Sequence, residues 1–270
     1  MEERPLPEPR AAPAADPPSN LRTLKLTIAY DGAAYSGWQI QPGVRTIQQT
    51  LQDAIAAITG APTAVVASGR TDAGVHAQGQ VVSFRTKNRL PADVLKRALN
   101  ATLPHDIRVL TSVEASPGFH ALRDTIGKRY RYVLNDGETA DVFRRHYAWH
   151  YRERLNAEAM HAAAQQLIGK HDFSSFETSG APRATSVRTV YELSVRRQSP
   201  TLPDEIHLEI EANGFLYNMV RTIVGSLVEI GRGARSAEWL AEVRDARARS
   251  RAGGTAPARG LVLLSVDYAE

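Results

Sequence analysis

Hydrophobic positions in the first half of the chain alternate between the two-residue repeat of strands and the longer repeat of helices. Residues 24–28 alternate apolar and polar side chains, which predicts a strand. Over residues 47–58 the apolar positions follow helical spacing, with Thr46 placed to cap the helix and Gly60 to end it. Further segments complete a β-α-β-β-α-β order, with strands expected at 65–66, 80–86 and 107–113 and a second helix at 91–101.

The second half of the chain repeats this order. Its expected elements are a strand at 128–134, a helix at 155–168, strands at 189–195 and 206–211, a helix at 216–230, an additional helix at 237–248 and a strand at 261–266. Two consecutive β-α-β-β-α-β units predict an α+β protein made of two tandem ferredoxin-like halves, each an antiparallel sheet backed by helices. We expect these halves, residues 21–126 and 127–270, to join edge to edge in one mixed, largely antiparallel sheet.

Composition narrows the classes that this chain can belong to. Residues 1–20 hold six prolines and no periodic apolar positions, which predicts a disordered tail without a signal peptide. No apolar run approaches the roughly 20 residues that cross a bilayer, so we expect no membrane association. The chain has no cysteine, which excludes disulfides, thiolate nucleophiles and Cys-ligated metals and suits a reducing cytoplasm.

The net charge of +4 is modest, but the kind of basic residue indicates what the chain binds. Five of the 33 basic residues are lysine, so 28 are arginine, whose planar fork matches a phosphate group with two hydrogen bonds. Genome composition produces the same bias in some organisms. On charge alone, a nucleic acid is favoured over an acidic small molecule as the partner.

The densest polar stretch is the run of residues 68–80 between two expected strands. It contains three glycines and is long for a hairpin loop, and such loops are often functional. In an ordinary loop, Asp72 would satisfy turn amides, Arg70 would pair with it at the surface and His76 would have no special role. Ser68, Asp72 and His76 supply the residue types of a catalytic triad, but triad partners normally come from distant segments.

Three other sets of residues carry possible chemistry. Residues 128–132 form a strand with two tyrosines on one face and two arginines on the other, suited to stacking a base, although packing within the sheet is an equal alternative. Arg221 lies beside the apolar stripe of the expected helix 216–230, where an inward-pointing arginine requires an anionic partner. His146 and His150 have no carboxylate at ligand spacing, so we expect packing there and not a metal site.

The run of residues 68–80 resembles the S-G-R-T-D-x-G-V-H-A-x-G-Q signature of the TruA-type tRNA pseudouridine synthases. Other segments that resemble this family are 30–32 with 37–39, 100–104 with Asp106, 119–121 with Arg123, 128–132, 171–176, 213–227, and 260–261 with 266–268. The resemblance extends over residues 22–269. It implies two ferredoxin-like halves around a central cleft and a homodimer. It also implies isomerisation of uridine to pseudouridine at positions 38–40 in the anticodon stem-loop of tRNA.

The resemblance also implies roles for particular residues. Asp72 matches the essential aspartate, Tyr130 the tyrosine that contacts the base, Arg221 the arginine that pairs with the aspartate, and Arg70 an arginine near the RNA backbone. The reaction needs no cofactor and no metal, because the atoms of uridine are conserved. Residues 247–259 match no fixed motif, so their role stays open.

Two alternatives to this enzyme remain at the level of sequence. A non-catalytic RNA-binding module of ferredoxin-like fold is one, although residues 80–86 lack the aromatic pattern that such modules use. A carboxylate glycosidase is the other, but the loop that carries Asp72 offers no second acidic residue for it.

Overall fold

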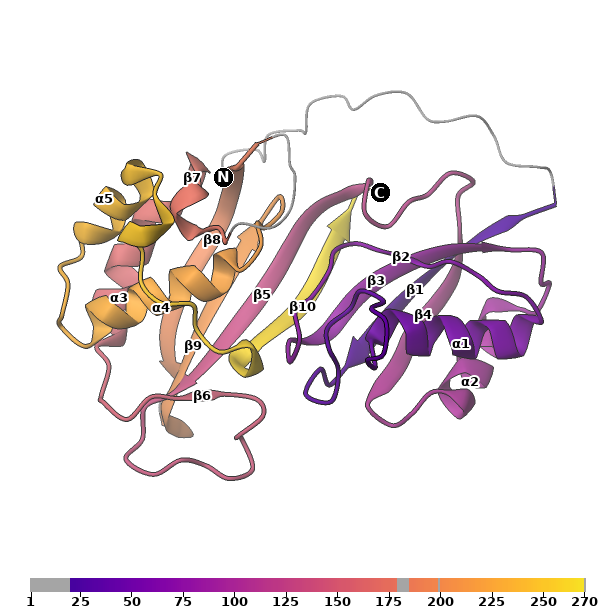
Figure 1. The fold of residues 1–270 in the computed structure, drawn as a ribbon, viewed down its shortest axis with the longest axis horizontal. Helices are drawn as coiled ribbons and strands as arrows, with labels where there is room; N and C mark the ends of the chain where they lie inside the picture. The colour runs from indigo at the N-terminus through magenta and orange to yellow at the C-terminus, as the bar shows by residue number, and fades with distance from the viewer. Residues whose placement is uncertain (1–19, 179–184, 199, 270) are drawn as a thin grey trace.

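A computed structural model describes residues 20–178, 185–198 and 200–269. Within them, ten strands form one sheet, with α1 and α2 packed over one end and α3, α4 and α5 over the other (Figure 1). The tail expected over residues 1–20 lies outside the described residues except for its last residue. None of the described helices is long and apolar enough to cross a bilayer.

The first half follows the expected order. Helix α1 begins after Thr46, whose side chain accepts the Gln49 amide, and it ends at Gly60 in the left-handed conformation that the sequence predicts. The elements of the first half are β1 (Arg22–Tyr30), α1 (Ile47–Thr59), β2 (Val66–Ala67), β3 (His76–Thr86), α2 (Ala92–Thr102) and β4 (Ile107–Ala115).

The second half repeats this order with three additional elements, β6, β7 and α5. Its elements are β5 (Thr125–Asn135), β6 (Trp149–His150), α3 (Ala157–Ala164), β7 (Gly169–Asp172), β8 (Val187–Gln198), β9 (Leu202–Ala212), α4 (Met219–Gly231), α5 (Trp239–Ala246) and β10 (Leu261–Tyr268). Strands β6 and β7 were not predicted. They are two and four residues long, too short for a repeat to be visible, and each exists only because it pairs with a longer strand.

The strand order confirms the duplicated fold. It runs β4-β1-β3-β10-β5-β9-β8-β7, with β2 beside β3 and β6 beside β5. The neighbours β4-β1-β3-β2 of the first half correspond to β10-β5-β9-β8 of the second. Strand β10 joins the halves, because it pairs parallel with β3 and antiparallel with β5. The boundary between residues 126 and 127 stays a prediction, since this pairing ties the halves together.

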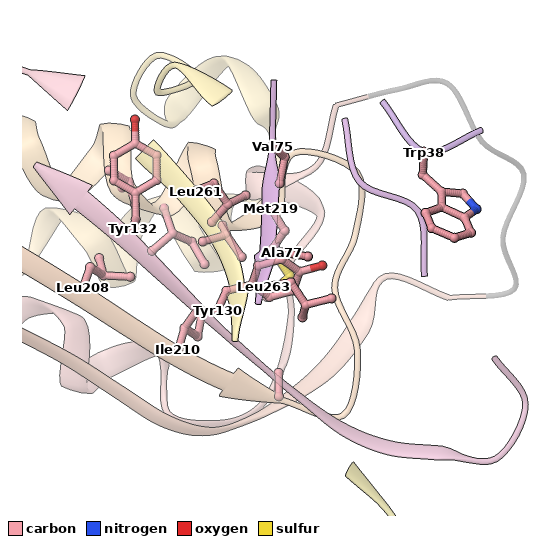
Figure 2. Packing of buried hydrophobic residues seen from close by; sticks show 14 of the residues in the cluster. Trp38, Val75, Ala77, Tyr130, Tyr132, Leu208, Ile210, Met219, Leu261 and Leu263 are labelled. Carbon is pink, nitrogen blue, oxygen red and sulfur yellow. The ribbon is translucent and has the colours of Figure 1, made fainter. Parts of the chain in front are cut away.

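A single apolar cluster continues through both halves. Figure 2 shows its centre, where side chains of β5, β9 and β10 meet Met219 at the start of α4. Tyr132 on β5 is fully buried there, and its hydroxyl donates a 2.7 Å hydrogen bond to the carbonyl of Pro257. The segment before β10 is therefore tied to the middle of the sheet.

The same segment lies against the backbone of α4 at a glycine. A Cβ atom at Gly225 would lie 1.8 Å from the carbonyl oxygen of Gly254, so the two backbones leave no room for a side chain. We expect Gly225→Ala to lower the free energy of unfolding by about 2–3 kcal/mol, because the overlap outweighs the roughly 1 kcal/mol by which alanine favours a helix. Chemical denaturation measures this change.

Gly254→Ala is the matched control, since a Cβ atom there meets nothing within 4 Å. It should leave the free energy of unfolding within about 0.5 kcal/mol of the original value. Equal stability of the two variants would contradict the close contact between α4 and residue 254.

Candidate active site

The loop that carries Asp72 is shorter than the sequence suggests. Strand β3 begins at His76, not at Gln80, so the connection from β2 spans only residues 68–75. The early start comes from the pairing of His76 and Ala77 with β10, which a local pattern does not reveal. At the base of the loop, the buried Ser68 hydroxyl donates to the Gln80 side chain at 2.6 Å, and the Gln80 amide donates to the carbonyl of Gly69.

The last residue of β1 and the segment between β1 and α1 hold the loop from a second side. The Trp38 amide donates to the Thr71 carbonyl at 2.9 Å, and the Tyr30 hydroxyl is hydrogen-bonded to the Thr71 hydroxyl at 2.8 Å. Gly37 has a φ of +89°, and a Cβ atom there would lie 2.8 Å from the same carbonyl oxygen. This close approach requires glycine, and it fixes the backbone beside Asp72 before any ligand arrives.

Arg221 on α4 forms an ion pair with Asp72. Its Nη1 lies 3.0 Å from Oδ2 of the carboxylate, and the two side chains are 17% and 28% exposed. The guanidinium also donates to the carbonyl of Ala256 at 2.8 Å and to the side chain of Asn218 at 2.7 Å. Ala256 and Asn218 thus hold the guanidinium of Arg221 in place, and one of its N–H groups donates to the Asp72 carboxylate, which solvent still reaches.

Asn218 is a part of the site that sequence reasoning missed. It precedes α4 with a φ of 61°, a left-handed conformation that asparagine tolerates better than most residues. This turn aims the side chain of Asn218 at Arg221. The signal in the sequence was the Asn-Gly-Phe-Leu-Tyr-Asn run before the helix, in which asparagine favours such turns.

Tyr130 lies on β5 and is 8% exposed, with its ring packed edge-on against Phe215 at a centroid distance of 5.1 Å. Burial raises the pKa of its hydroxyl above the ordinary value, and the nearby Tyr30 and Asp72 add to the shift. The hydroxyl makes no hydrogen bond within the described residues. The ring is therefore a wall of the site with little free face, while its hydroxyl has no protein partner there.

The arginines of β5 are not beside this tyrosine. Arg129 and Arg131 project from the other face of the sheet, where they bind carboxylates of β8 and β9 at distances of 2.6 Å. Strand alternation therefore places the arginines on the face opposite the tyrosines, as expected, but they are bound by glutamates there. Glutamates 63–82 residues away in the chain neutralise them, and strand alternation alone cannot show such partners.

Lys128 lies on the Tyr130 side of β5 and supports the Asp72 loop. Its Nζ donates to the carbonyl of Ser68 at 2.6 Å and occupies the space that a side chain at Gly69 would need. Burial lowers the pKa of this amine to about 8, and the charge of Arg188 adds to the effect. The sequence pattern gave the strand position of Lys128 but no reason to look for its partner.

The other residues singled out in the sequence, Arg70, Ser68 and His76, form neither an ion pair with Asp72 nor a catalytic triad. Arg70 is exposed and does not pair with Asp72, which is bound by Arg221 instead. His76 is buried and hydrogen-bonded to the Gly32 amide and the His146 carbonyl, so with Ser68 bound to Gln80 there is no triad. In the described part of the chain, no three His, Asp or Glu side chains converge as metal ligands.

The family model and three relatives that match this chain are all described as tRNA pseudouridine synthases. A family model described as tRNA pseudouridine synthase matches residues 26–121 and 163–269. The chain is 47% identical over 247 residues to a tRNA pseudouridine synthase A of Moorella thermoacetica, covering 91% of this chain and 99% of that protein. It is 43% identical to one of Acetivibrio thermocellus over 248 residues, covering 92% of this chain and all of that protein. It is 45% identical to one of Brevibacillus brevis over 248 residues, again covering 92% of this chain and all of that protein.

Proposed function

The chain belongs to the tRNA pseudouridine synthase family, and from this premise we propose that it isomerises uridines at positions 38–40 of the tRNA anticodon arm, with Asp72 as the catalytic residue. The protein is an isomerase that converts uridine to pseudouridine. The observation that carries the assignment of Asp72 is its ion pair with Arg221, in a loop held by hydrogen bonds on both sides. Membership of an enzyme family weighs against the alternative of a non-catalytic RNA-binding module.

The chemistry needs a carboxylate next to the ribose. The bond between C1′ and N1 breaks, the uracil turns, and a bond forms between C1′ and C5, while C5 loses a proton and N1 gains one. Asp72 either attacks C1′ or removes the 2′ proton, and both routes require the ionised form. In the described residues the ion pair engages Oδ2 of the carboxylate, which leaves Oδ1 for the substrate.

Arg221 orients this carboxylate. Its contacts to Ala256 and Asn218 keep the guanidinium in place when the substrate enters, so the carboxylate needs no rearrangement. A uracil stacked inside an RNA stem cannot reach Asp72, and the target nucleotide is therefore flipped out before the reaction.

Tyr130 contacts the flipped base, and Arg70 contacts the RNA backbone. The near-complete burial of the Tyr130 ring favours contact through its hydroxyl edge more than broad stacking on its face. The hydroxyl keeps its proton at neutral pH, as tyrosine ordinarily does, and this proton is able to bind a uracil oxygen. Arg70 is exposed two residues before Asp72, a position suited to a phosphate near the target nucleotide.

The working form is a homodimer in the cytoplasm. The resemblance of the chain to its family supports the dimer, and the absence of cysteine suits a reducing compartment. Light scattering on the purified protein would give twice the chain mass of 29.5 kDa if this is correct. A monomer at the concentration used for activity would contradict it.

The position of modification is tested directly with tRNA. Unmodified transcripts that carry a single uridine at 38, 39 or 40 are incubated with the purified protein, and pseudouridine is located by mass spectrometry after nuclease digestion. We expect product at these positions and none in a transcript with cytidine at all three. Modification confined to another arm of the tRNA would overturn the assignment of the substrate site.

Replacing Tyr130 with phenylalanine distinguishes the role of its hydroxyl from that of its ring. If the hydroxyl relays the C5 proton, Tyr130→Phe should slow tritium release from 5-tritiated uridine by about 100-fold, the lower end of general acid–base help. Stability should stay within about 1 kcal/mol, because the hydroxyl has no protein partner to lose within the described residues. Alanine is a poor probe here, since the cavity it leaves costs about 3–5 kcal/mol.

Tyr132→Phe serves as the control on the same strand face. Its hydroxyl binds the Pro257 carbonyl, so its loss should reduce stability by about 1 kcal/mol and leave tritium release unchanged. Tritium release at the original rate in Tyr130→Phe would exclude the proton relay.

A further inference from the structure

A cavity of about 440 Å³ is lined by four arginines. It lies between the end of β5, the segment that follows β5, and Arg259, two residues before β10. The arginines are Arg144, Arg145, Arg152 and Arg259, and one acidic residue, Asp141, shares the lining. Such a concentration of guanidinium groups around one hollow is a feature of anion sites.

Most of this positive charge is not neutralised by the protein. Arg144 binds Glu205 at 2.5 Å. The side chains of Arg145 and Arg259 donate to the carbonyls of Val142 and Ala148. Within the described chain no carboxylate lies at ion-pair distance from Arg145, Arg152 or Arg259, and all three are exposed. By contrast, Arg129 and Arg131 on the far face of the sheet each pair with a glutamate.

The walls of the cavity are tied to the loop that carries Asp72. The carbonyl of His146, next to Arg145, is 2.8 Å from Nε2 of the buried His76, which follows that loop. The Tyr147 hydroxyl donates to Asp31 at 2.6 Å. On the other wall, Ala258 precedes Arg259 and would touch a Cβ atom at Gly74 at 3.5 Å. The segments that carry these arginines are therefore tied to the loop of the proposed catalytic Asp72.

We propose that this arginine cavity binds a backbone phosphate of the tRNA, a second anchor apart from the nucleotide that reacts. The inference rests on the proposed function, because the substrate is what brings phosphates to the loop. Guanidinium forks bind a phosphodiester through paired hydrogen bonds without reading the base, which suits an enzyme that acts on several uridines in one arm. The anchor fixes the RNA while different nucleotides enter the site.

The test compares RNA binding by charge-removing and charge-keeping variants. Arg145→Gln/Arg152→Gln removes two exposed cations from the cavity, and the lysine pair at the same positions keeps the charge. The control is Arg196→Gln, an exposed arginine on β8 that does not line the cavity. Thermal melting checks that each variant is folded, and light scattering checks its oligomeric state.

We expect the glutamine pair to raise the Kd for tRNA about tenfold or more at 150 mM salt. The slope of log K against log salt should become shallower by about 0.7–0.9 for each phosphate that the variant no longer binds. The lysine pair should recover most of the slope, and Arg196→Gln should match the original protein. An unchanged Kd and slope in the glutamine pair would overturn the proposal.

Two other results would also overturn it. If the glutamine pair binds tRNA normally but loses binding of inorganic phosphate in calorimetry, the cavity takes a small phosphorylated compound. If the loss of tRNA binding accompanies conversion of a dimer to monomers, the cavity is a contact between subunits. Failure of the proposed function is distinguishable, because it would appear as turnover by Asp72→Asn or product at other positions, whereas this test reads binding alone.

Discussion

Asp72→Asn should reduce pseudouridine formation by at least about 10⁴-fold, a loss of about 5.5 kcal/mol of transition-state stabilisation. Asparagine keeps the shape of the side chain and an oxygen that accepts from Arg221, so the loop should keep its position. A neutral amide, however, neither attacks C1′ nor removes a proton from C2′. Pseudouridine is measured by mass spectrometry in single-turnover reactions with excess enzyme.

Binding should separate this effect from a loss of substrate. The Kd for tRNA should stay within about threefold of the original value, since one carboxylate contributes little to holding phosphates. Asp53→Asn on α1 is the control, an exposed aspartate whose replacement should change neither rate nor affinity. Turnover by Asp72→Asn within tenfold of the original rate would remove Asp72 from the reaction.

Arg221→Ala should lower the rate by about 10²–10³-fold and the free energy of unfolding by about 2–3 kcal/mol. The substitution removes the partner of Asp72 and leaves the carbonyl of the buried Ala256 without its donor. The stability loss stays below the value for a fully buried pair, because the carboxylate is 28% exposed and water solvates it in part. Rates are measured well below the melting temperature, so that the two effects are read separately.

Arg232→Ala, at the residue that follows the same helix, is the matched control. Arg232 pairs with Glu229 at the surface, and its removal should cost less than about 0.5 kcal/mol with no loss of rate. Arg221→Lys should lie between alanine and arginine, because an ammonium group cannot reach Asp72, Ala256 and Asn218 together. A rate for Arg221→Ala equal to the original would exclude a role in orienting the carboxylate.

The local elements of the fold could be predicted because their signals are local. Thr46 and Gly60 bound α1 as capping chemistry requires, and strand alternation located β1, β5 and β9. The expected helix at 155–168 was too long, since α3 ends at Ala164 and the chain continues through a 3₁₀ turn into β7. The pairing of β7 with β8 decided that ending, and it is invisible in a short window of sequence.

The site was less accessible to pattern reasoning than the fold. Asp72 and Arg221 are 149 residues apart, and only the resemblance of their motifs to a known family indicated that they meet. Their ion pair is present in the structure, and Tyr130 lies close enough for its pKa to respond to Asp72. The supports supplied by Asn218, Ala256 and Lys128 involve backbone groups and turns, which leave no distinctive spacing in a sequence.

The position of β10 has a consequence for biosynthesis. This strand leaves the ribosome after every other described strand, yet it fills the gap between β3 and β5. Until it emerges, the nascent chain carries two sheets with open edges, and such edges pair readily with other polypeptides. Products of stalled or prematurely ended translation that lack β10 are therefore inactive and prone to co-aggregate, and they are natural clients for chaperones and proteases.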